Sequence, residues 1–467
     1  MNSYQFPSVV PAEIFRAYDI RGEASPDGVS VPLAYGLGLA VAAELQAIGQ
    51  TDLVVGRDAR LSGPALTDAL IAGLLAGGCD VVDLGEVPTP LVYFATHYLA
   101  QTSGVMVTAS HNPGHHNGFK IVLDRKTMST DGVQGLYQRL LARDVVVTAQ
   151  PGTRSTYDIV PEYLTYVIDT VPVKRGLKVV VDCGNGIAGR IAPLLYEHLG
   201  VEVIPLFCEV DGRFPNHHPD PTVLENLVDL QAAVLAHEAD LGLAFDGDAD
   251  RLGMVDERGE VIWPDRQLML FAKDVLSRHP GAPIVFDVKC SAYLPAVIAA
   301  QGGKPIMYRT GHSLVKAKMR AVDAMLAGEM SGHIFFKEDW FGFDDGLYVG
   351  ARMLRIIASQ TEPVSQVFSL FPNGINTPEI KVLIDESRKA EVMLQLPQTG
   401  CFEGMSIETM DGLRVSDASG WGLVRPSNTS PYLTLRFEAD SEAELAVIQA
   451  RFRKALSAVM PGVSLPF

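Results

Sequence analysis

Three segments of the chain repeat the same order of predicted elements, and this repeat constrains the fold more than any other feature. In each segment a short β-branched run is followed by an Ala- and Leu-rich stretch and then by a second β-branched run. The first runs cover residues 52–58, 178–186 and 283–290, the helical stretches 65–78, 188–200 and 291–303, and the returning runs 79–90, 201–207 and 304–311. Continuous apolar strands separated by about a dozen helical residues predict βαβ units with buried, parallel strands.

The three copies begin a little over 100 residues apart, which is the size of a domain, and 467 residues are too many for one core. Beyond residue 372 the pattern changes. Residues 378–384 and 432–439 alternate like half-buried strands, and Ser441 and Glu444 form a capping box before an amphipathic helix. We therefore expect an α/β architecture with three related βαβ-based mixed-sheet domains and a smaller C-terminal α+β domain. The expected ranges are 1–156, 157–258, 259–371 and 372–467.

Composition excludes several classes of protein. The chain has 38 Lys and Arg against 55 Asp and Glu, a net charge of −17, which argues against nucleic acid or anionic lipid as partners. A local cationic pocket could still bind a small anionic substrate. The five cysteines never form a CxxC pair, so we expect reduced, mostly buried thiols in a cytoplasmic protein. No signal peptide is expected, and the most apolar stretch, residues 31–49, is too short to span a bilayer.

The stretch LGLAFDGDADRLGMVD, residues 241–256, places three aspartates between two apolar strands. Asp246, Asp248 and Asp250 alternate with small residues, so their carboxylates can converge on one hard divalent cation. An ordinary acidic turn is the alternative, but three clustered, unpaired charges between apolar strands are costly. A calcium EF-hand is disfavoured because Arg251 takes the place of its glycine and both flanks are strands. We favour a magnesium site, with Arg251 available to a bound phosphate.

The stretch VMVTASHNPGHHNGFK, residues 105–120, ends an apolar strand in a turn that carries Ser110. Ser110 and His111 are adjacent, but consecutive side chains diverge, and no G-x-S-x-G motif is present. His115 and His116 have no cysteine or carboxylate at zinc-site spacing, which argues against a metal site there. Because a cation site and cationic loops accompany Ser110, phosphoryl transfer explains this serine better than acyl transfer.

Two further stretches carry polar side chains suited to binding a ligand. In AGEMSGHIFF, residues 327–336, the alternation of Glu329, Ser331 and His333 lets their side chains point the same way, as polyhydroxyl recognition and proton transfer require. A structural turn explains that stretch equally well. GLVRPSNTSPYL, residues 422–433, offers donors for a phosphate or carboxylate, although a solvated turn is the ordinary interpretation of its composition. Its donors are Arg425, Ser427, Asn428 and Thr429.

Weaker candidates are scattered over the rest of the chain. Tyr18 and Arg21 lie in YDIRG, Lys289 in DVKC and His312 in RTGHSLVK. The last two stretches follow predicted strands of a βαβ unit, where α/β folds place their ligand-binding loops.

Four of these motifs, in this order, resemble those of the α-D-phosphohexomutase superfamily, most closely its bacterial phosphomannomutase/phosphoglucomutase group. TASHNP (108–113) is similar to the phosphoserine loop, DGDADR (246–251) to the magnesium loop, GEMSGH (328–333) to the sugar-binding loop and RPSNT (425–429) to the phosphate-binding loop. The resemblance runs from end to end and implies four domains around a central cleft. It also implies reversible phosphoryl transfer between the 1- and 6-positions of glucose and mannose phosphates, through a phosphoserine and a hexose 1,6-bisphosphate.

The resemblance implies a role for each candidate residue. Ser110 would carry the phosphate and, with Asp246, Asp248 and Asp250, hold Mg²⁺. Lys120 and His333 would serve as general acid and base, with His111 and Arg251 close to the transferring phosphate. Substrate contacts would come from Tyr18, Arg21, Lys289, His312, Glu329, Ser331, Arg425, Ser427, Asn428 and Thr429. The implied partners are phosphosugars alone, and we expect a monomer that uses Mg²⁺ and hexose 1,6-bisphosphate.

Three other functions fit parts of the same sequence. A phosphoglucosamine mutase would differ mainly in the sugar-binding loop. A magnesium-dependent sugar phosphatase would use the same serine and cation if water reached the intermediate. A non-catalytic phosphosugar-binding protein would leave Ser110 and the three aspartates without a purpose.

Overall fold

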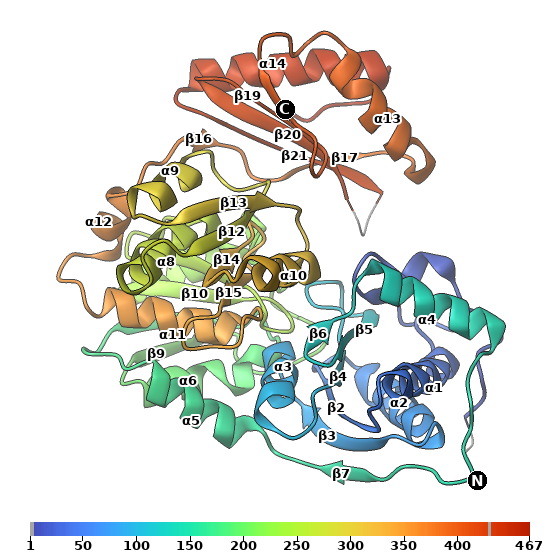
Figure 1. The fold of residues 1–467 in the computed structure, drawn as a ribbon. Helices are drawn as coiled ribbons and strands as arrows, with labels where there is room; N and C mark the ends of the chain where they lie inside the picture. Colours follow the sequence, from blue (N-terminus) through green and yellow to red (C-terminus); the bar gives the residue numbers. More distant parts are fainter. Residues whose placement is uncertain (1–3, 428–430) are drawn as a thin grey trace. The chain divides into compact units, whose positions relative to one another are not determined.

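The computed structural model describes residues 4–427 and 431–467. The chain forms two compact units (Figure 1). The first unit consists of Met1–Pro264 with Ser331–Phe368, and the second of Asp265–Met330 with Ser369–Phe467. Within the described residues no helix has the length and apolar character needed to cross a membrane. The five cysteines are free thiols and three of them are buried, as the sequence predicted.

The N-terminal part of the first unit is built on a mixed sheet in the order β1-β5-β4-β2-β3-β7, with β6 paired to β5. Strands β2, β3, β4 and β7 run parallel, whereas β5 is antiparallel to β1, β4 and β6. The strands are β1 (Ile20–Glu23), β2 (Asp52–Arg57), β3 (Asp80–Glu86), β4 (Gly104–Val107), β5 (His116–Leu123), β6 (Lys126–Thr127) and β7 (Arg154–Thr156). The helices are α1 (Val31–Ala47), α2 (Gly63–Ala76), α3 (Thr89–Tyr98) and α4 (Thr130–Ala142).

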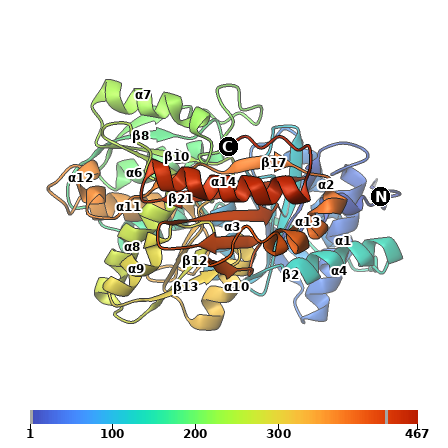
Figure 2. The ribbon, with the colours of Figure 1, turned by 90° about the horizontal axis from the view of Figure 1, so that it is seen from above.

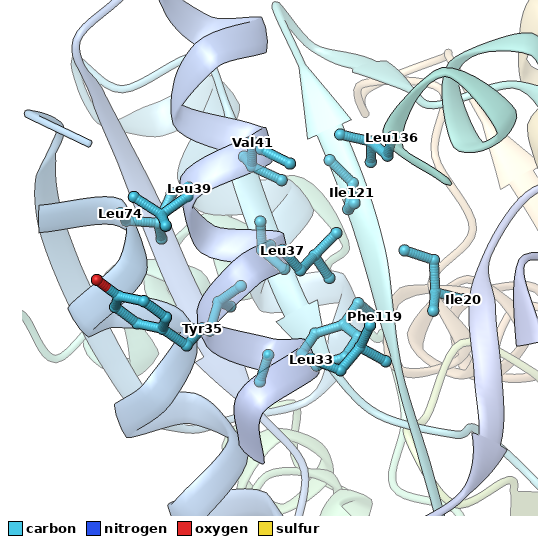
Figure 3. Close-up of a cluster of buried hydrophobic side chains, with 14 of the residues drawn as sticks. Ile20, Leu33, Tyr35, Leu37, Leu39, Val41, Leu74, Phe119, Ile121 and Leu136 are labelled. Carbon is cyan, nitrogen blue, oxygen red and sulfur yellow. The ribbon is translucent and has the colours of Figure 1, made fainter. Parts of the chain in front are cut away.

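Helix α1 is apolar on several faces because it packs on two sides at once. Figure 3 shows Leu37 of α1 facing Ile121 of β5, while Leu39 lies beside Leu74 of α2. The two helices approach closely at Gly38, where an added Cβ would lie 2.2 Å from a backbone oxygen of α2. The apolar stretch at residues 31–49 is therefore a buried core helix, and its packing fixes the sheet whose strands carry the Ser110 turn.

The rest of the first unit centres on a second mixed sheet, in the order β11-β10-β8-β9. Its strands are β8 (Lys178–Asp182), β9 (Glu202–Leu206), β10 (Leu241–Phe245) and β11 (Leu252–Asp256), of which only β11 is antiparallel to its neighbour. The accompanying elements are α5 (Val160–Thr170), α6 (Ala192–His198), α7 (Val228–His237), β15 (Ile334–Phe336), α11 (Gly346–Ile357) and α12 (Val364–Ser369), which ends at the boundary between the units. Because β10 and β11 form a hairpin, the aspartates between them are held at a sheet edge.

The second unit contains three parallel strands in the order β13-β12-β14 and an antiparallel sheet in the order β16-β21-β20-β19-β18, with β17 paired to β21. Helix α14 crosses one face of the antiparallel sheet (Figures 1 and 2). Phe452 of this helix packs on Phe437 of β21. The first group comprises α8 (Pro264–Arg278), β12 (Pro283–Asp287), α9 (Tyr293–Ala300), β13 (Lys304–Tyr308), α10 (His312–Val322) and β14 (Leu326–Gly328). The second comprises β16 (Ile375–Asn376), β17 (Ile380–Leu383), α13 (Lys389–Gln395), β18 (Ser406–Glu408), β19 (Leu413–Ser416), β20 (Gly420–Pro426), β21 (Tyr432–Ala439) and α14 (Glu442–Val459).

The predicted repeat is confirmed. The units β2-α2-β3, β8-α6-β9 and β12-α9-β13 each join two adjacent parallel strands through a helix. The capping box is also confirmed, since Ser441 Oγ accepts a hydrogen bond from Glu444 N at 3.3 Å and donates one to its carboxylate at 2.7 Å. The predicted α/β class with a smaller α+β part therefore holds, while the exact ranges given for the four domains stay predictions.

Candidate active site

Ser110 lies in a tight turn directly after β4 and is buried. Its φ of +51° is in the left-handed region, which a residue with a Cβ adopts only when its surroundings hold it there. Ser110 Oγ donates a hydrogen bond to Asp246 Oδ2 at 2.8 Å and lies 3.2 Å from His111 Nδ1. The turn thus aims the serine hydroxyl at the loop that carries the three aspartates.

The three aspartates of that loop are completely buried. One carboxylate oxygen from each of Asp246, Asp248 and Asp250 lies within 4.8 Å of the other two. Among the described residues none donates a hydrogen bond to the buried Oδ1 of Asp248. Converging carboxylates, one of which has a buried oxygen with no donor among the described residues, are the ligands that a hard cation such as Mg²⁺ prefers. The residues present therefore fit a magnesium site.

Lys120, on β5, supplies positive charge to the same loop. Its Nζ donates to Asp248 Oδ2 at 2.6 Å and to Asp250 Oδ2 at 2.5 Å. Burial lowers the pKa of Lys120, but the charges of Asp248 and Asp250 outweigh it and raise this pKa well above the usual value. Lys120 is consequently an ammonium group at neutral pH, and can stabilise negative charge or release a proton rather than accept one.

Asp246 and Asp250 differ in the direction in which their surroundings shift the carboxyl pKa. Burial, with the charges of Asp248 and Asp250, raises the pKa of Asp246 well above its ordinary value. Burial acts in the same direction on Asp250, but Lys120 and His333 reverse it and hold the pKa of Asp250 well below that value. A divalent cation would favour the ionised form of Asp246.

Arg251 and His333 complete this cluster. Arg251 Nε lies 3.6 Å from Asp246 Oδ2 and 3.3 Å from His333 Nε2. The same imidazole nitrogen is 3.2 Å from Asp250 Oδ1, and Nδ1 of that ring is 3.0 Å from Ser331 Oγ. Ser331, predicted to hold a sugar hydroxyl, thus contacts and orients the imidazole of His333.

Residues around the Ser110 turn provide further donors. Arg21, on β1, donates to Asn112 Oδ1 at 3.0 Å and to Asp19 Oδ2 at 2.5 Å, and Tyr18 is half-buried in the turn before this strand. Burial, reinforced by Arg251 and Arg21, lowers the pKa of His111 well below its usual value. His111 is therefore neutral near pH 7, so it can exchange hydrogen bonds with a phosphate but adds no charge to the site.

The second unit brings together a separate set of the predicted residues. Lys289, just after β12, is buried, forms an ion pair with Glu379 and lies 4.0 Å from Asp287 Oδ2. Burial lowers the pKa of Lys289, but Glu379 and Asp287 outweigh it and raise this pKa. Glu329 Oε1 accepts a hydrogen bond at 2.5 Å from the backbone N–H of Gly311. This contact ties the sugar-binding motif to the segment just before His312.

Arg425 lies on strand β20 rather than in a loop, and this strand ends at Pro426. Its Nε is 3.2 Å from Asp411 Oδ2, which also accepts a hydrogen bond at 2.8 Å from the N–H of Thr310. His312 begins helix α10 two residues further on and is buried. The phosphate-binding motif is thus linked to the start of α10 within the second unit. Two of the predicted residues, Asn428 and Thr429, lie outside the described residues.

The sequence did not reveal several residues that hold the predicted site residues in place, either in the first unit or in the second. Asp58 and Arg60 follow β2 and form a buried ion pair at 3.0 Å beneath the Ser110 turn. Thr89, at the start of α3, donates to Asp248 Oδ2 at 2.6 Å. Asp411 and Glu379 hold Arg425 and Lys289, as described above. The signal that could have found Asp58 and Arg60 is their position at the carboxyl end of a parallel strand, where α/β sheets carry functional loops.

Comparison with known proteins agrees with this geometry. The chain matches models of the phosphoglucomutase/phosphomannomutase alpha/beta/alpha domains I, II and III over residues 12–144, 161–259 and 263–373, and of the C-terminal domain over residues 379–455. It is 52% identical to a phosphomannomutase/phosphoglucomutase of Pseudomonas aeruginosa, with all of both chains covered. It is 46% identical to a phosphoglucomutase of Neisseria meningitidis, over 96% of this chain and 97% of that protein.

A solved structure supports the same conclusion. The crystal structure of a phosphoglucomutase/phosphomannomutase family protein from Burkholderia thailandensis is 47% identical and has a TM-score of 0.93. The match covers 98% of this chain and all of that one. Family models, curated relatives and solved structure all extend over nearly the full length, and the chain therefore belongs to the phosphoglucomutase/phosphomannomutase family.

Proposed function

We propose that this enzyme reversibly moves a phosphoryl group between the 1- and 6-positions of glucose and mannose phosphates, through phosphorylated Ser110 and a hexose 1,6-bisphosphate. One observation carries the proposal. Ser110 Oγ, held in a left-handed turn, donates to Asp246 Oδ2 at 2.8 Å, directly beside the buried Asp248, Asp250 and Lys120. A hydroxyl pointed into a carboxylate cluster that fits Mg²⁺ is suited to carry a phosphoryl group.

Asp246, Asp248 and Asp250, together with the phosphoserine, would hold Mg²⁺, and the ion would supply neutralisation of charge on the phosphoryl oxygens. In the transfer step the bond between phosphorus and Ser110 Oγ breaks while a bond from phosphorus to a sugar oxygen forms. We assign the proton released by the sugar hydroxyl to the imidazole of His333, which Ser331 orients from its far side. Lys120, fully protonated, stabilises the negative charge left on Ser110 Oγ. Arg251 and neutral His111 bind the moving phosphoryl oxygens.

The second unit supplies the groups for the rest of the substrate. We assign the phosphate that does not react to Arg425 and Ser427, together with Asn428 and Thr429, and the sugar hydroxyls to Glu329 and Lys289. His312, Tyr18 and Arg21 are assigned as additional phosphate or hydroxyl contacts. The name of the Pseudomonas aeruginosa relative, which covers both mannose and glucose, supports acceptance of both sugars. We further propose that the enzyme acts in the cytoplasm as a monomer, with hexose 1,6-bisphosphate as its activator.

The test is the intact mass of the purified protein together with its activity. We expect a species heavier by one phosphate that disappears in Ser110→Ala and persists in the control Ser129→Ala, because Ser129 is exposed and its side chain makes no helix-capping hydrogen bond. Isomerisation of glucose and mannose 1-phosphates should be lost with the phosphate. A Ser110→Ala protein of full activity would contradict the proposal.

Two assays separate the alternatives. Faster conversion of glucosamine 1-phosphate than of either hexose 1-phosphate would indicate a phosphoglucosamine mutase. Release of inorganic phosphate at the rate of turnover would indicate a phosphatase, since water would then take the phosphoryl group instead of the sugar hydroxyl.

A further inference from the structure

We propose that Arg60, paired with Asp58, is a positioning residue that holds the Ser110 turn in its left-handed conformation and so keeps the serine hydroxyl aimed at the aspartate loop. The proposal rests on the proposed role of Ser110 as phosphate carrier. Neither Arg60 nor Asp58 reaches the aspartate loop through any hydrogen bond or ion pair found among the described residues. The charges of both residues do act on Asp248 across space, but Arg60→Lys keeps the charge of Arg60. An effect of that variant on the chemistry should therefore pass through the backbone of the turn.

Arg60 uses its whole guanidinium group on this turn. Nη2 donates to the carbonyl oxygens of Ser110 and Asn112, both at 2.6 Å, and Nη1 donates to those of Pro113 and His116 at 2.6 and 3.0 Å. Its Nε donates to Asp58 Oδ2 at 3.0 Å. A guanidinium has five N–H donors, and here all five are directed at oxygen atoms. No other side chain type could satisfy four converging carbonyls in one plane.

Asp58 binds Arg60 and also, through Thr108, fixes the backbone N–H of Ser110. Its Oδ2 accepts a hydrogen bond from Thr108 Oγ1 at 2.7 Å, and Thr108 Oγ1 in turn accepts one from the backbone N–H of Ser110 at 2.9 Å. The N–H and the carbonyl of Ser110 are thus both fixed by side chains that meet at Asp58. This double attachment is what a positive φ at a non-glycine residue requires, because a free turn would relax out of that region.

The arginine is sealed from solvent on its remaining side. Its side chain is completely buried, and the ring of Phe214 lies 5.3 Å from the guanidinium carbon, within cation–π range. At Gly212 an added Cβ would lie 2.8 Å from the Cα of Arg60, so this segment packs directly on it. Water is therefore excluded from the guanidinium itself and from its hydrogen bond to the carbonyl of Ser110, while its bonds to the other three carbonyls are partly buried.

The chain offers a matched control for the loss of a buried ion pair. Arg352 of α11 is equally buried in the same unit, pairs with Glu338 at 2.5 Å and lies over the ring of Phe336 at 4.3 Å. The hydrogen bonds of Arg352 to Glu338 and Tyr348 do not involve the Ser110 turn. Arg352→Lys therefore measures what the weakening of a buried arginine pair does to stability alone.

The experiment compares Arg60→Lys, Thr108→Val and Arg352→Lys by steady-state kinetics, thermal unfolding and ³¹P NMR of the phosphorylated protein. For Arg60→Lys we expect kcat to fall about 100-fold with KM changed less than about threefold, because a misplacement on the order of 1 Å costs that much. The phosphoserine resonance should shift or broaden. Thr108→Val, which has nearly the same shape, should lower kcat by about 10-fold, and Arg352→Lys should lower only the unfolding temperature.

Two results would contradict the proposed positioning role of Arg60. One is an Arg60→Lys enzyme whose kcat and ³¹P spectrum match those of Arg352→Lys at an equal loss of stability. The other is a crystal structure of Arg60→Lys in which Ser110 keeps its positive φ and its contact with Asp246, whatever the activity. Failure of the proposed function gives a different result, namely a wild-type protein that carries no phosphate on Ser110.

Discussion

The two units hold their charged residues in opposite ways. In the first unit three carboxylates from a single stretch of five residues, Asp246 to Asp250, face the ammonium of Lys120. In the second unit two cations pair with carboxylates from separate segments of the chain: Lys289 with Glu379, beside Asp287, and Arg425 with Asp411. The first arrangement concentrates negative charge, whereas the second distributes carboxylates among separate cations. The comparison teaches that one centre is suited to a cation and the other to an anion.

This difference predicts which kinetic constant each centre controls. A cation held among buried carboxylates stabilises charge that develops as the phosphoryl group moves, so its loss lowers kcat. A cation paired with a carboxylate can exchange that partner for a substrate phosphate, which binds the ground state and transition state alike. Changes in the second unit should therefore act mainly on KM.

The largest effect should follow removal of the divalent cation from the first unit. Chelation should lower kcat by at least about 1,000-fold, as expected when several kcal/mol of charge stabilisation are lost, and added Mg²⁺ should restore it. Asp248→Asn should give a loss of similar size that Mg²⁺ does not restore, because one ligand is then neutral. The measurement is kcat across a Mg²⁺ titration, with Asp124→Asn, an exposed aspartate paired with Lys126, as the control. Full activity in the presence of a chelator would contradict the prediction that the carboxylates of the first unit hold a cation on which kcat depends.

Arg425→Lys tests whether changes in the second unit act mainly on KM, and it should have the next largest effect. Lysine keeps the charge but not the planar pair of donors that matches a phosphate. We expect KM for hexose 1-phosphates to rise about 30-fold, with kcat within about threefold of the wild type. Initial-rate kinetics with both sugars would check this. A fall in kcat at unchanged KM would show that Arg425 acts in the transition state instead.

Much of the fold was predictable because its signals are local. A β-branched run followed by a dozen helical residues and another such run is visible in a window of about 40 residues, and Ser441 with Glu444 is visible in four. The carboxylate loop was equally visible, since Asp246, Asp248 and Asp250 are neighbours in sequence. These features depend on contacts between residues that are already close along the chain.

The supporting contacts were not predictable, because they depend on packing between distant segments. Asp411 meets Thr310 across 101 residues, and Arg60 meets the carbonyl of Ser110 across 50. Every residue has a backbone carbonyl, so the sequence of residues 110–116 does not indicate that four of these carbonyls accept hydrogen bonds from one arginine. Ser331 is a different case, because it lies two residues from His333 and the sequence predicted that these side chains point the same way. The alternation did not show that Ser331 contacts the imidazole itself.

Asp411→Asn should have a smaller effect than Arg425→Lys. The amide oxygen of asparagine can still accept the hydrogen bond from Thr310 N, but the charge that holds the guanidinium of Arg425 is lost. We expect KM to rise about fivefold, which corresponds to about 1 kcal/mol, with little change in kcat. Asp417→Asn is the matched control, because Asp417 caps an exposed turn in the same sheet through Ser419. Equal KM values for the two variants would show that Asp411 does not hold Arg425 in position for substrate binding.

The smallest effect concerns the pH dependence of stability at the Lys289–Glu379 pair. Burial raises the pKa of Glu379, but the charges of Lys289 and Arg425 outweigh it and hold this pKa below its usual value. A carboxyl whose pKa is lower in the folded state stabilises the fold above its unfolded pKa and loses that contribution as pH falls through the folded one. Because Glu379 is about 30% exposed, we expect Glu379→Gln to cost only about 1 kcal/mol at pH 7, after allowing for solvent screening. Urea unfolding at a series of pH values should show this cost shrinking as the pH falls below the usual pKa of a glutamate carboxyl, whereas a cost that is constant with pH would mean that the pair contributes packing rather than charge.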